Sequence, residues 1–293
     1  MTAPAERTGP LLRIPDRPAA GTPPETVVMI HPGAIPLSHY RELSDGLAPT
    51  RELVLVDLEQ VPEYFQAALT RGRATITVEE IAARVAEALR NSPVIGAAWV
   101  LAGWSFGGVI SHALLDALDD GEGPELVVVL DALAPVPEFT AVDGALDRFA
   151  VLGWFAMYLA AKRGGTVTVT ERELRAGDVE HGLEVVLRAA VAGGALHPGT
   201  GVAGLRKVFQ AYHDGLLRNN ELVATYRPHR TTTPLVLLRP AHGLVDRPGA
   251  LGWDQLTPSP RVLHTPGDHY TMLRHPEAVR RFAEVPTAAA QHP

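Results

Sequence analysis

Short apolar runs alternate with amphipathic segments along most of this chain. Six of the runs are candidate strands, at residues 26–30, 52–58, 97–103, 125–132, 234–240 and 261–267. Between them lie segments with the spacing of one helix face, and residues 77–91 show this spacing most clearly. Strands that are apolar throughout and separated by helices are typical of a parallel sheet covered on both faces. The pattern therefore predicts an α/β fold with a mostly parallel central sheet flanked by helices.

One long segment interrupts this alternation. From about residue 137 to 230 the sequence shows helical patterns and almost no strand signal, and residues 143–165 are strongly apolar. Because candidate strands flank this segment on both sides, we expect a helical lid inserted between two strands of the sheet. Two helix starts carry a threonine followed three residues later by glutamate, which is the capping-box pattern; they are Thr77 with Glu80 and Thr170 with Glu173.

The two ends of the chain differ from this body. Residues 1–25 are rich in Pro, Ala, Thr and Gly and are interpreted as a flexible linker, and residues 287–293 as a tail. One folded domain over residues 26–286 is expected. Without cysteine the chain has no disulfide, thiol nucleophile or thiolate metal site.

Charge and hydropathy bear on the partners of the protein. The formal net charge is −7 and no basic stripe is visible, so nucleic acid binding is not expected. No stretch approaches the ~18 consecutive apolar residues of a membrane helix. No secretory signal is visible either. A cytoplasmic protein without a membrane span is therefore expected.

Residues 103–107 form a G-x-S-x-G pattern between a candidate strand and a candidate helix. A serine hydroxyl is a poor nucleophile and needs a base and a site for the oxyanion. A tight strand-to-helix turn would expose the hydroxyl of Ser105 and place the N–H of Phe106 as an oxyanion donor at the helix N-terminus. The alternative is a glycine-rich turn in which Ser105 only caps the helix.

A base and an acid are expected at the same edge of the sheet as Ser105. His269 follows the last strand in a glycine-containing loop, and ligand sites lie at the carboxyl ends of parallel strands. Asp131 follows the strand after the serine, and Asp246 follows the next strand of the sheet. Either carboxylate could orient the imidazole. The residues favour Asp131, because an aspartate directly after a wholly apolar strand is hard to explain as surface decoration, but they leave Asp246 open.

The second oxyanion donor is expected in the loop after the first strand. Gly33 and Ala34 are the candidates there, and Gly33 would allow a close approach of the backbone to the substrate. His31 and His39 flank this loop and are interpreted as structural residues.

Four segments together resemble the thioesterase domains that end nonribosomal peptide and polyketide synthases. They are HPGAIPLSHYRELSDGL, AGWSFGGVISHALLDAL, VVVLDALAP and TPGDHYTML. These domains are α/β-hydrolases with a helical lid, and the resemblance covers about residues 27–282, with the lid matching least. The position of the family's acid is matched by Asp131, whereas discrete editing thioesterases commonly carry it near Asp246. Trp104, where editing enzymes more often have histidine, also favours the chain-terminating class.

The resemblance implies a mechanism. Ser105 would take an acyl chain from the phosphopantetheine arm of an acyl- or peptidyl-carrier protein domain. His269 would remove the serine proton, Asp131 would hold the imidazole, and the N–H groups of Gly33 and Phe106 would stabilise the oxyanion. Release by water would give hydrolysis, and release by a nucleophile within the chain would give macrocyclisation. No metal or bound cofactor is expected beyond the carrier's arm.

Three other functions stay open at this stage. They are a discrete editing (type II) thioesterase, a lipase- or esterase-like hydrolase that acts on free esters, and a binding protein on a hydrolase scaffold. The presence of serine, histidine and aspartate candidates argues against the last of these.

Overall fold

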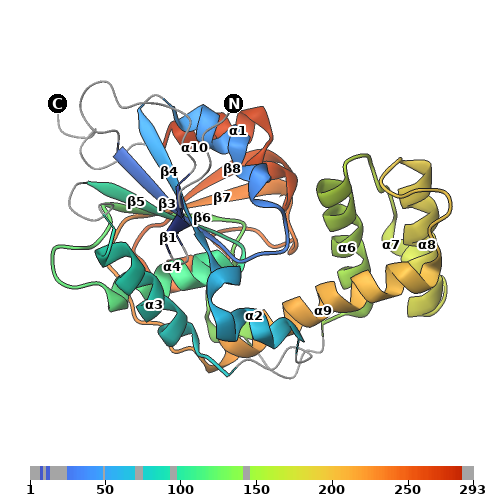
Figure 1. Ribbon diagram of the computed structural model, residues 1–293, viewed down its shortest axis with the longest axis horizontal. Coiled ribbons are helices and arrows are strands. Elements are labelled where there is room, and N and C mark those ends of the chain that lie inside the picture. The colour runs from blue at the N-terminus through green and yellow to red at the C-terminus, as the bar shows by residue number, and fades with distance from the viewer. Residues whose placement is uncertain are drawn as a thin grey trace.

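A single sheet forms the centre of the protein (Figure 1). The computed structural model describes residues 7–8, 11–13, 25–48, 50–69, 75–92, 98–140 and 146–285. The sheet has the strand order β1-β2-β4-β3-β5-β6-β7-β8. Its strands are β1 (Arg7–Thr8), β2 (Leu11–Arg13), β3 (Glu25–His31), β4 (Arg51–Asp57), β5 (Trp99–Trp104), β6 (Leu126–Leu130), β7 (Leu235–His242) and β8 (Arg261–Asp268). From β4 to β8 all neighbours are parallel. The six predicted runs are therefore confirmed as the six parallel strands.

Helices cover both faces of the sheet. Outside the segment between β6 and β7 they are α1 (Arg41–Leu47), α2 (Pro62–Leu69), α3 (Val78–Arg90), α4 (Phe106–Ala117) and α10 (Pro276–Ala283). Short 3-10 helices lie at Leu37–Tyr40, Leu58–Gln60, Trp253–Gln255 and Thr271–Leu273. In Figure 1, α1 and α10 lie above the sheet, and α3 and α4 lie below it. The predicted α/β fold, a mostly parallel sheet flanked by helices, is confirmed.

Alternate residues of each strand enter two separate cores. Val27 and Met29 of β3 pack in the core that contains α1 and α10, whereas Val28 and Ile30 pack in the core that contains α3 and α4. All four side chains are fully buried. Because both faces are covered, the central residues of β3 and β4 and all those of β5 and β6 are buried and almost all apolar, which is why the sequence shows continuous runs there rather than alternation.

Both predicted capping boxes are present. At the start of α3, Thr77 Oγ1 accepts from the N–H of Glu80 at 3.2 Å, and Glu80 Oε2 accepts from the N–H of Thr77 at 2.8 Å. The same reciprocal pair joins Thr170 and Glu173 at the start of a short helix in the insertion. These bonds satisfy N–H groups that have no partner within the helix.

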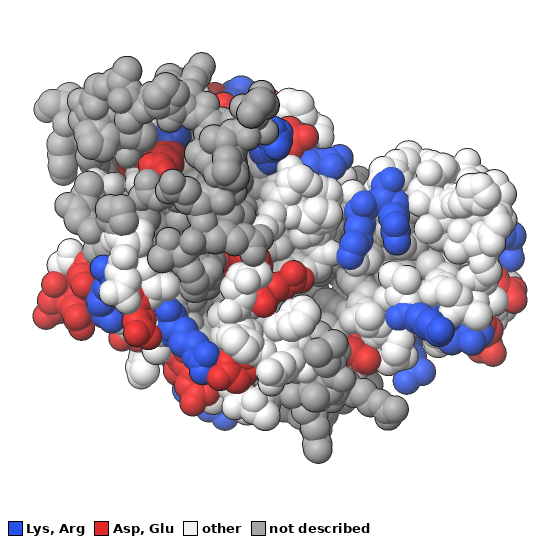
Figure 2. Space-filling view, viewed as in Figure 1, with Lys and Arg blue, Asp and Glu red and all other residues white. Residues whose placement is uncertain are grey.

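The segment between β6 and β7 is a helical insertion, as expected. Its helices are α5 (Pro137–Thr140), α6 (Arg148–Arg163), α7 (Glu171–Leu174), α8 (Val179–Ala192) and α9 (Val202–Thr225). In Figure 1, α6, α7 and α8 lie beside the sheet, and α9 runs from them back towards α2. Figure 2 shows Lys and Arg side chains over α6 and α9 and a group of acidic ones near α3. No helix in the described part of the chain is long and apolar enough to cross a membrane.

The N-terminal segment differs in part from the linker interpretation. No strand was expected within residues 1–25, yet β1 and β2 lie there and extend the sheet beyond β4. The pairing of β2 with β4 is antiparallel, with Leu11 opposite Val56 and Arg13 opposite Val54. A strand of two or three residues is too short to show a hydrophobic pattern in the sequence, and its register is set by the strand that it pairs with. Most of the remaining linker and the predicted tail lie outside the described residues.

Candidate active site

Ser105 occupies a strained turn between β5 and α4. Its backbone has φ 56° and ψ −127°, a conformation that residues other than glycine rarely adopt and that is concentrated at functional sites. The Ser105 N–H donates to the carbonyl of Leu130 at 3.0 Å, and its carbonyl accepts from Gly108 at 2.9 Å. The side chain is half-buried and makes no capping hydrogen bond to α4. The structure thus differs from the alternative in which this serine only caps the helix.

Three glycines allow α4 to start this close to the sheet. A Cβ at Gly103 would lie 2.3 Å from the carbonyl oxygen of Gly107. A Cβ at Gly107 would lie 2.4 Å from the carbonyl oxygen of Ile30, and one at Gly108 would lie 2.6 Å from the Ala132 Cβ. The glycine spacing of the motif is therefore needed for packing, and it brings the turn against the end of β3.

Replacing Gly107 by alanine is expected to destabilise the protein by about 3 kcal/mol, because the new methyl group meets backbone that cannot rotate away. Gly215→Ala in α9 is the matched control, since no atom lies within 4 Å of its added Cβ. That variant is expected to gain up to about 1 kcal/mol from higher helix propensity. Urea unfolding midpoints measure both, and equal midpoints for Gly107→Ala and the unaltered protein would contradict the packing argument.

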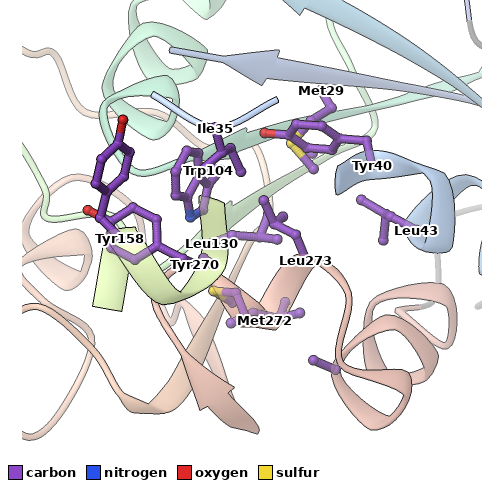
Figure 3. Packing of buried hydrophobic residues seen from close by; sticks show 14 of the residues in the cluster. Met29, Ile35, Tyr40, Leu43, Trp104, Leu130, Tyr158, Tyr270, Met272 and Leu273 are labelled. Atoms are coloured by element: carbon purple, nitrogen blue, oxygen red, sulfur yellow. The ribbon is translucent and has the colours of Figure 1, made fainter. Parts of the chain in front are cut away.

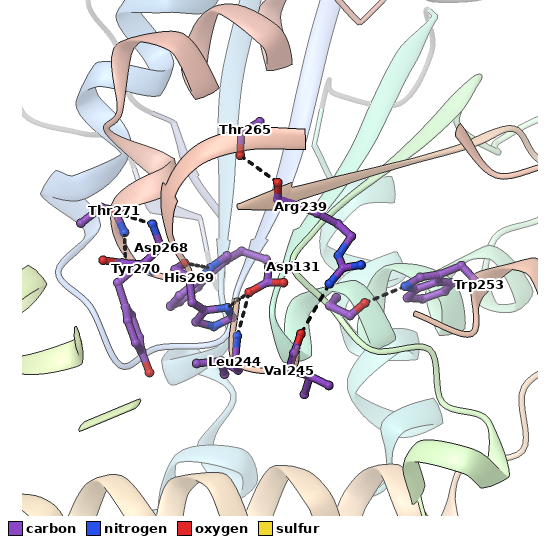
Figure 4. Close-up of polar contacts among 12 residues, drawn as sticks. Asp131, Arg239, Leu244, Val245, Trp253, Thr265, Asp268, His269, Tyr270 and Thr271 are labelled. Atoms are coloured by element: carbon purple, nitrogen blue, oxygen red, sulfur yellow. Dashed lines mark hydrogen bonds and ion pairs between the residues drawn. The ribbon is translucent and has the colours of Figure 1, made fainter. Parts of the chain in front are cut away.

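His269 and Asp131 form a buried pair at the carboxyl edge of the sheet. Their Nδ1 and Oδ2 atoms lie 2.7 Å apart, and the side chains are 2% and 4% exposed (Figure 4). Asp131 directly follows β6 in a left-handed conformation, with φ 43°. Its Oδ2 also accepts from the N–H of Leu244 at 3.4 Å. A hydrogen-bonded carboxylate of this kind fixes the tautomer and the orientation of an imidazole.

Asp246 does not share this environment. It is exposed in the loop after β7, whereas the first residues of that loop pack over Asp131. A Cβ at Gly243 would lie 2.8 Å from Asp131 Oδ1. The loop therefore covers one candidate carboxylate and leaves the other in solvent. Asp268, next to the histidine, accepts instead from the backbone of Tyr270 and Thr271.

Trp104 links the serine turn to the histidine. The indole Nε1 of this residue, which precedes Ser105, donates to the carbonyl of His269 at 2.8 Å. The two rings lie 4.9 Å apart. Within the described residues no hydrogen bond joins the Ser105 hydroxyl to the imidazole, and such catalytic bonds are often long before substrate binds. The structure thus joins His269 to Asp131 and places both beside the turn.

The two candidate oxyanion donors belong to adjoining segments. Phe106 is the first residue of α4, where N–H groups are unpaired within the helix. Gly33 and Ala34 follow β3 with φ 90° and 74°, so both peptides are turned into the left-handed region. From the insertion, Lys162 Nζ reaches the carbonyl of Ala34 at 3.4 Å. The loop is therefore in contact with α6.

His31 and His39 have structural surroundings, in agreement with their interpretation from the sequence. His31 is buried, its Nδ1 lies 3.1 Å from the Tyr40 hydroxyl, and its ring stacks beside Trp104. Burial lowers the pKa of His31 to about 4, so this ring is neutral at neutral pH. Burial also lowers the pKa of His39, whose Nε2 accepts from Arg274 at 3.4 Å.

Tyr158 and Tyr212 of the insertion and Tyr270, next to His269, form an aromatic wall beside the histidine. The hydroxyls of Tyr212 and Tyr270 lie 2.7 Å apart, and the ring of Tyr158 lies 4.9 Å from that of Tyr212. Figure 3 shows Tyr270 and Tyr158 beside Trp104. Burial raises the pKa of Tyr270 well above its usual value, so its hydroxyl stays protonated. Sequence reasoning missed this wall, although Tyr270 adjoins His269 in the chain.

The arrangement of sheet, serine turn and histidine loop is that of the α/β-hydrolase fold. Residues 25–155 match the family model described as Thioesterase domain. This match confirms the resemblance to thioesterase domains found in the sequence. No curated protein matches the sequence significantly.

Solved structures of thioesterase domains are similar to this chain. A four-domain nonribosomal peptide synthetase, AB3403, matches 94% of the chain with 26% identity and a TM-score of 0.61, and the match spans 20% of that synthetase. RedJ, a thioesterase from the prodiginine pathway of Streptomyces coelicolor, matches 92% of this chain and 94% of its own with 17% identity and a TM-score of 0.55. The NocB thioesterase domain, in covalent complex with a fluorophosphonate nocardicin G analogue, matches 90% of this chain and 96% of its own, with 20% identity and a TM-score of 0.52.

Proposed function

We propose that this protein releases an acyl or peptidyl chain from the phosphopantetheine thioester of a carrier domain, through an acyl-enzyme on Ser105. The observation that carries the proposal is the buried bond between His269 and Asp131 beside the strained Ser105 turn. The thioesterase family match and the likeness to a synthetase that contains such a domain support the substrate class. The covalent fluorophosphonate complex of NocB supports a reactive serine.

The first half of the reaction transfers the chain to the enzyme. His269 Nε2 takes the proton of the Ser105 hydroxyl as Oγ attacks the thioester carbonyl, and Asp131 stabilises the imidazolium. The carbonyl electron pair moves onto oxygen, where the N–H groups of Phe106 and Gly33 stabilise the negative charge. When the tetrahedral intermediate collapses, the carbon–sulfur bond breaks and the imidazolium returns a proton to the departing thiolate.

The second half releases the chain. His269 takes a proton from water or from a nucleophile within the chain, which attacks the ester carbonyl. Collapse of the second intermediate breaks the bond to Oγ, and the proton returns to Ser105. The aromatic wall beside His269 favours an acyl-enzyme sheltered from water, because three tyrosine rings fill the space on that side. We therefore favour release by the internal nucleophile, which gives a macrocycle, over hydrolysis.

A thioester substrate tests this proposal. A carrier-loaded or N-acetylcysteamine acyl thioester is expected to add its acyl mass to the protein, with the adduct on the peptide that contains Ser105. Intact-protein and peptide mass spectrometry measure the adduct, and Ser105→Ala is the control. An absent adduct with a substrate that the protein turns over would contradict the acyl-enzyme. Faster turnover of free oxygen esters than of thioesters would instead favour a lipase-like enzyme, and a strong preference for acetyl groups would favour an editing one.

A further inference from the structure

Tyr64 lies where α2, α9 and the loop after β3 meet. Its ring is buried, and its hydroxyl donates to the carbonyl of Pro32 at 2.9 Å. The hydroxyl oxygen accepts from Nη2 of Arg218, in α9, at 2.7 Å. A second acceptor, Asn219 Oδ1, lies farther from the hydroxyl, at 3.1 Å, and also accepts from Arg218 Nε at 3.2 Å. The shorter of the two contacts of the tyrosine hydroxyl with an acceptor is therefore the one to the backbone of the loop that holds a candidate oxyanion donor.

This contact acts on the Gly33 N–H through a single rigid unit. The carbonyl of Pro32 and the N–H of Gly33 belong to the same planar trans peptide, in which they point in opposite directions. A hydrogen bond that holds the carbonyl therefore also sets the direction of the N–H. It polarises the peptide as well, which makes the N–H a stronger donor. Gly33 has no side chain that could hold this peptide, and its φ is 90°.

The same tyrosine supports the other candidate donor. Its ring stacks on the ring of Phe106, with centroids 5.8 Å apart and planes 3° apart. Phe106 is the first residue of α4, where the N–H has no partner within the helix, and it directly follows Ser105. One side chain therefore touches both residues whose N–H groups are proposed to bind the oxyanion.

Arg218 holds the tyrosine in this position. Its guanidinium lies over the Tyr64 ring at 3.9 Å, and its Nη1 reaches the Tyr64 carbonyl at 3.5 Å. Burial raises the pKa of Tyr64 to about 12, so the hydroxyl keeps its proton at neutral pH. Since α9 also supplies Tyr212 to the aromatic wall, one helix connects the insertion with the loop after β3.

We propose that Tyr64, held by Arg218, is a positioning residue for the oxyanion hole, which orients the Gly33 N–H and supports Phe106. The inference rests on the proposed function, because it requires an oxyanion formed by attack of Ser105. It assigns the last helix of the insertion a part in catalysis, through the guanidinium that fixes the tyrosine.

Tyr64→Phe is expected to lower kcat about tenfold and to change KM by less than about twofold, since loss of a whole oxyanion donor costs about 10²–10³ in kcat. The variant keeps the ring and its stacking and removes only the hydroxyl. Tyr226→Phe is the matched control, because it also removes the hydroxyl of a buried tyrosine. That hydroxyl forms a hydrogen bond of 3.0 Å with His112 Nδ1, on another part of α4. Both variants are expected to melt within a few degrees of each other, while only Tyr64→Phe loses turnover.

A trifluoromethyl ketone gives a direct readout of the oxyanion hole. Octylthio-trifluoroacetone is expected to add to Ser105: a bond forms between Oγ and the ketone carbon, and the carbonyl electron pair moves onto oxygen. Fluorine NMR against pH then measures the pKa of the resulting hemiketal. A tenfold weaker hold on the oxyanion in Tyr64→Phe is expected to raise that pKa by about one, and Tyr226→Phe is expected to leave it unchanged.

The outcomes separate the two proposals. If the unaltered protein forms no adduct at Ser105, the proposed function is wrong. If the adduct forms but its hemiketal pKa is the same in the unaltered protein and in Tyr64→Phe, the positioning role is overturned. Arg218→Lys provides the same measurement should Tyr64→Phe not fold. It keeps the charge but loses the forked guanidinium, so the hemiketal pKa is expected to rise in the same direction.

Discussion

Ser105→Ala is expected to lower kcat towards an acyl thioester by a factor on the order of 10⁴ to 10⁶, the loss seen when the nucleophile of a serine hydrolase is removed. Without Oγ no acyl-enzyme can form, and the remaining groups can only stabilise direct attack by water. The strained backbone at this position, with φ 56°, belongs to the turn and not to the hydroxyl, so the fold should be kept. Steady-state kinetics with an N-acetylcysteamine thioester measure the loss.

Two further measurements make this result interpretable. Ser44→Ala makes the same replacement in α1, away from the candidate site, and is expected to leave kcat unchanged. The melting temperature of Ser105→Ala should equal that of the unaltered protein, which would show that the site and not the fold was lost. If Ser105→Ala kept kcat within tenfold of the unaltered protein, the serine would not be the nucleophile.

Asp131→Asn is expected to lower kcat by about 10⁴, with the fold intact. The carboxylate accepts from Nδ1 of His269 at 2.7 Å, and this leaves Nε2 free to take the serine proton. An asparagine can donate to Nδ1 instead, which places the imidazole proton on Nε2 and removes the base. The kcat of the variant with the same thioester is the measurement.

Asp246→Asn is the matched control for this change, since it makes the same replacement in the other carboxylate that follows a strand of the sheet. Asp246 is exposed, and its replacement is expected to change kcat less than about twofold, as for surface groups away from a reacting centre. Loss of activity in Asp246→Asn with full activity in Asp131→Asn would reverse the assignment of the acid.

The strands and the candidates for the reaction were predictable because they depend on local patterns. The central parallel strands are buried on both faces, so their apolar runs are continuous and easily recognised, as in residues 26–30. The ends of such strands share one edge of the sheet, so residues at or just after the ends of the runs 97–103, 125–132 and 261–267 could be brought together without coordinates. The capping box at Thr77 was predictable for the same reason, since it needs only residues three apart.

The different surroundings of the two aspartates are visible only in the structure. Both follow neighbouring strands, β6 and β7, and strand order alone places both at the same edge. What distinguishes them is the side-chain environment: Asp131 is turned by a φ of 43° and covered by the loop after β7, whereas Asp246 lies further along that loop in solvent. Sequence patterns do not contain the path of such a loop.

Tyr64 and Arg218 were not recognised at all. The tyrosine lies in the short helix α2, whose segment carries no motif, and the arginine lies in a long helix with ordinary amphipathic spacing. Their relation to Phe106 comes from three segments that are far apart in the chain and meet only in the fold. A contact of this kind has no signature in the spacing of residues.

The pairing of β2 with β4 has a consequence for where this domain should be considered to start. A strand at the border of a sheet offers unpaired N–H and C=O groups to other chains, and proteins cover such borders to avoid association through them. Leu11 to Arg13 provide that cover for β4, although they precede residue 25, where the match to the family begins. A boundary drawn at the family match would remove this cover from β4. The solubility of the full chain therefore does not predict that of the shortened domain, in which β4 is left uncovered.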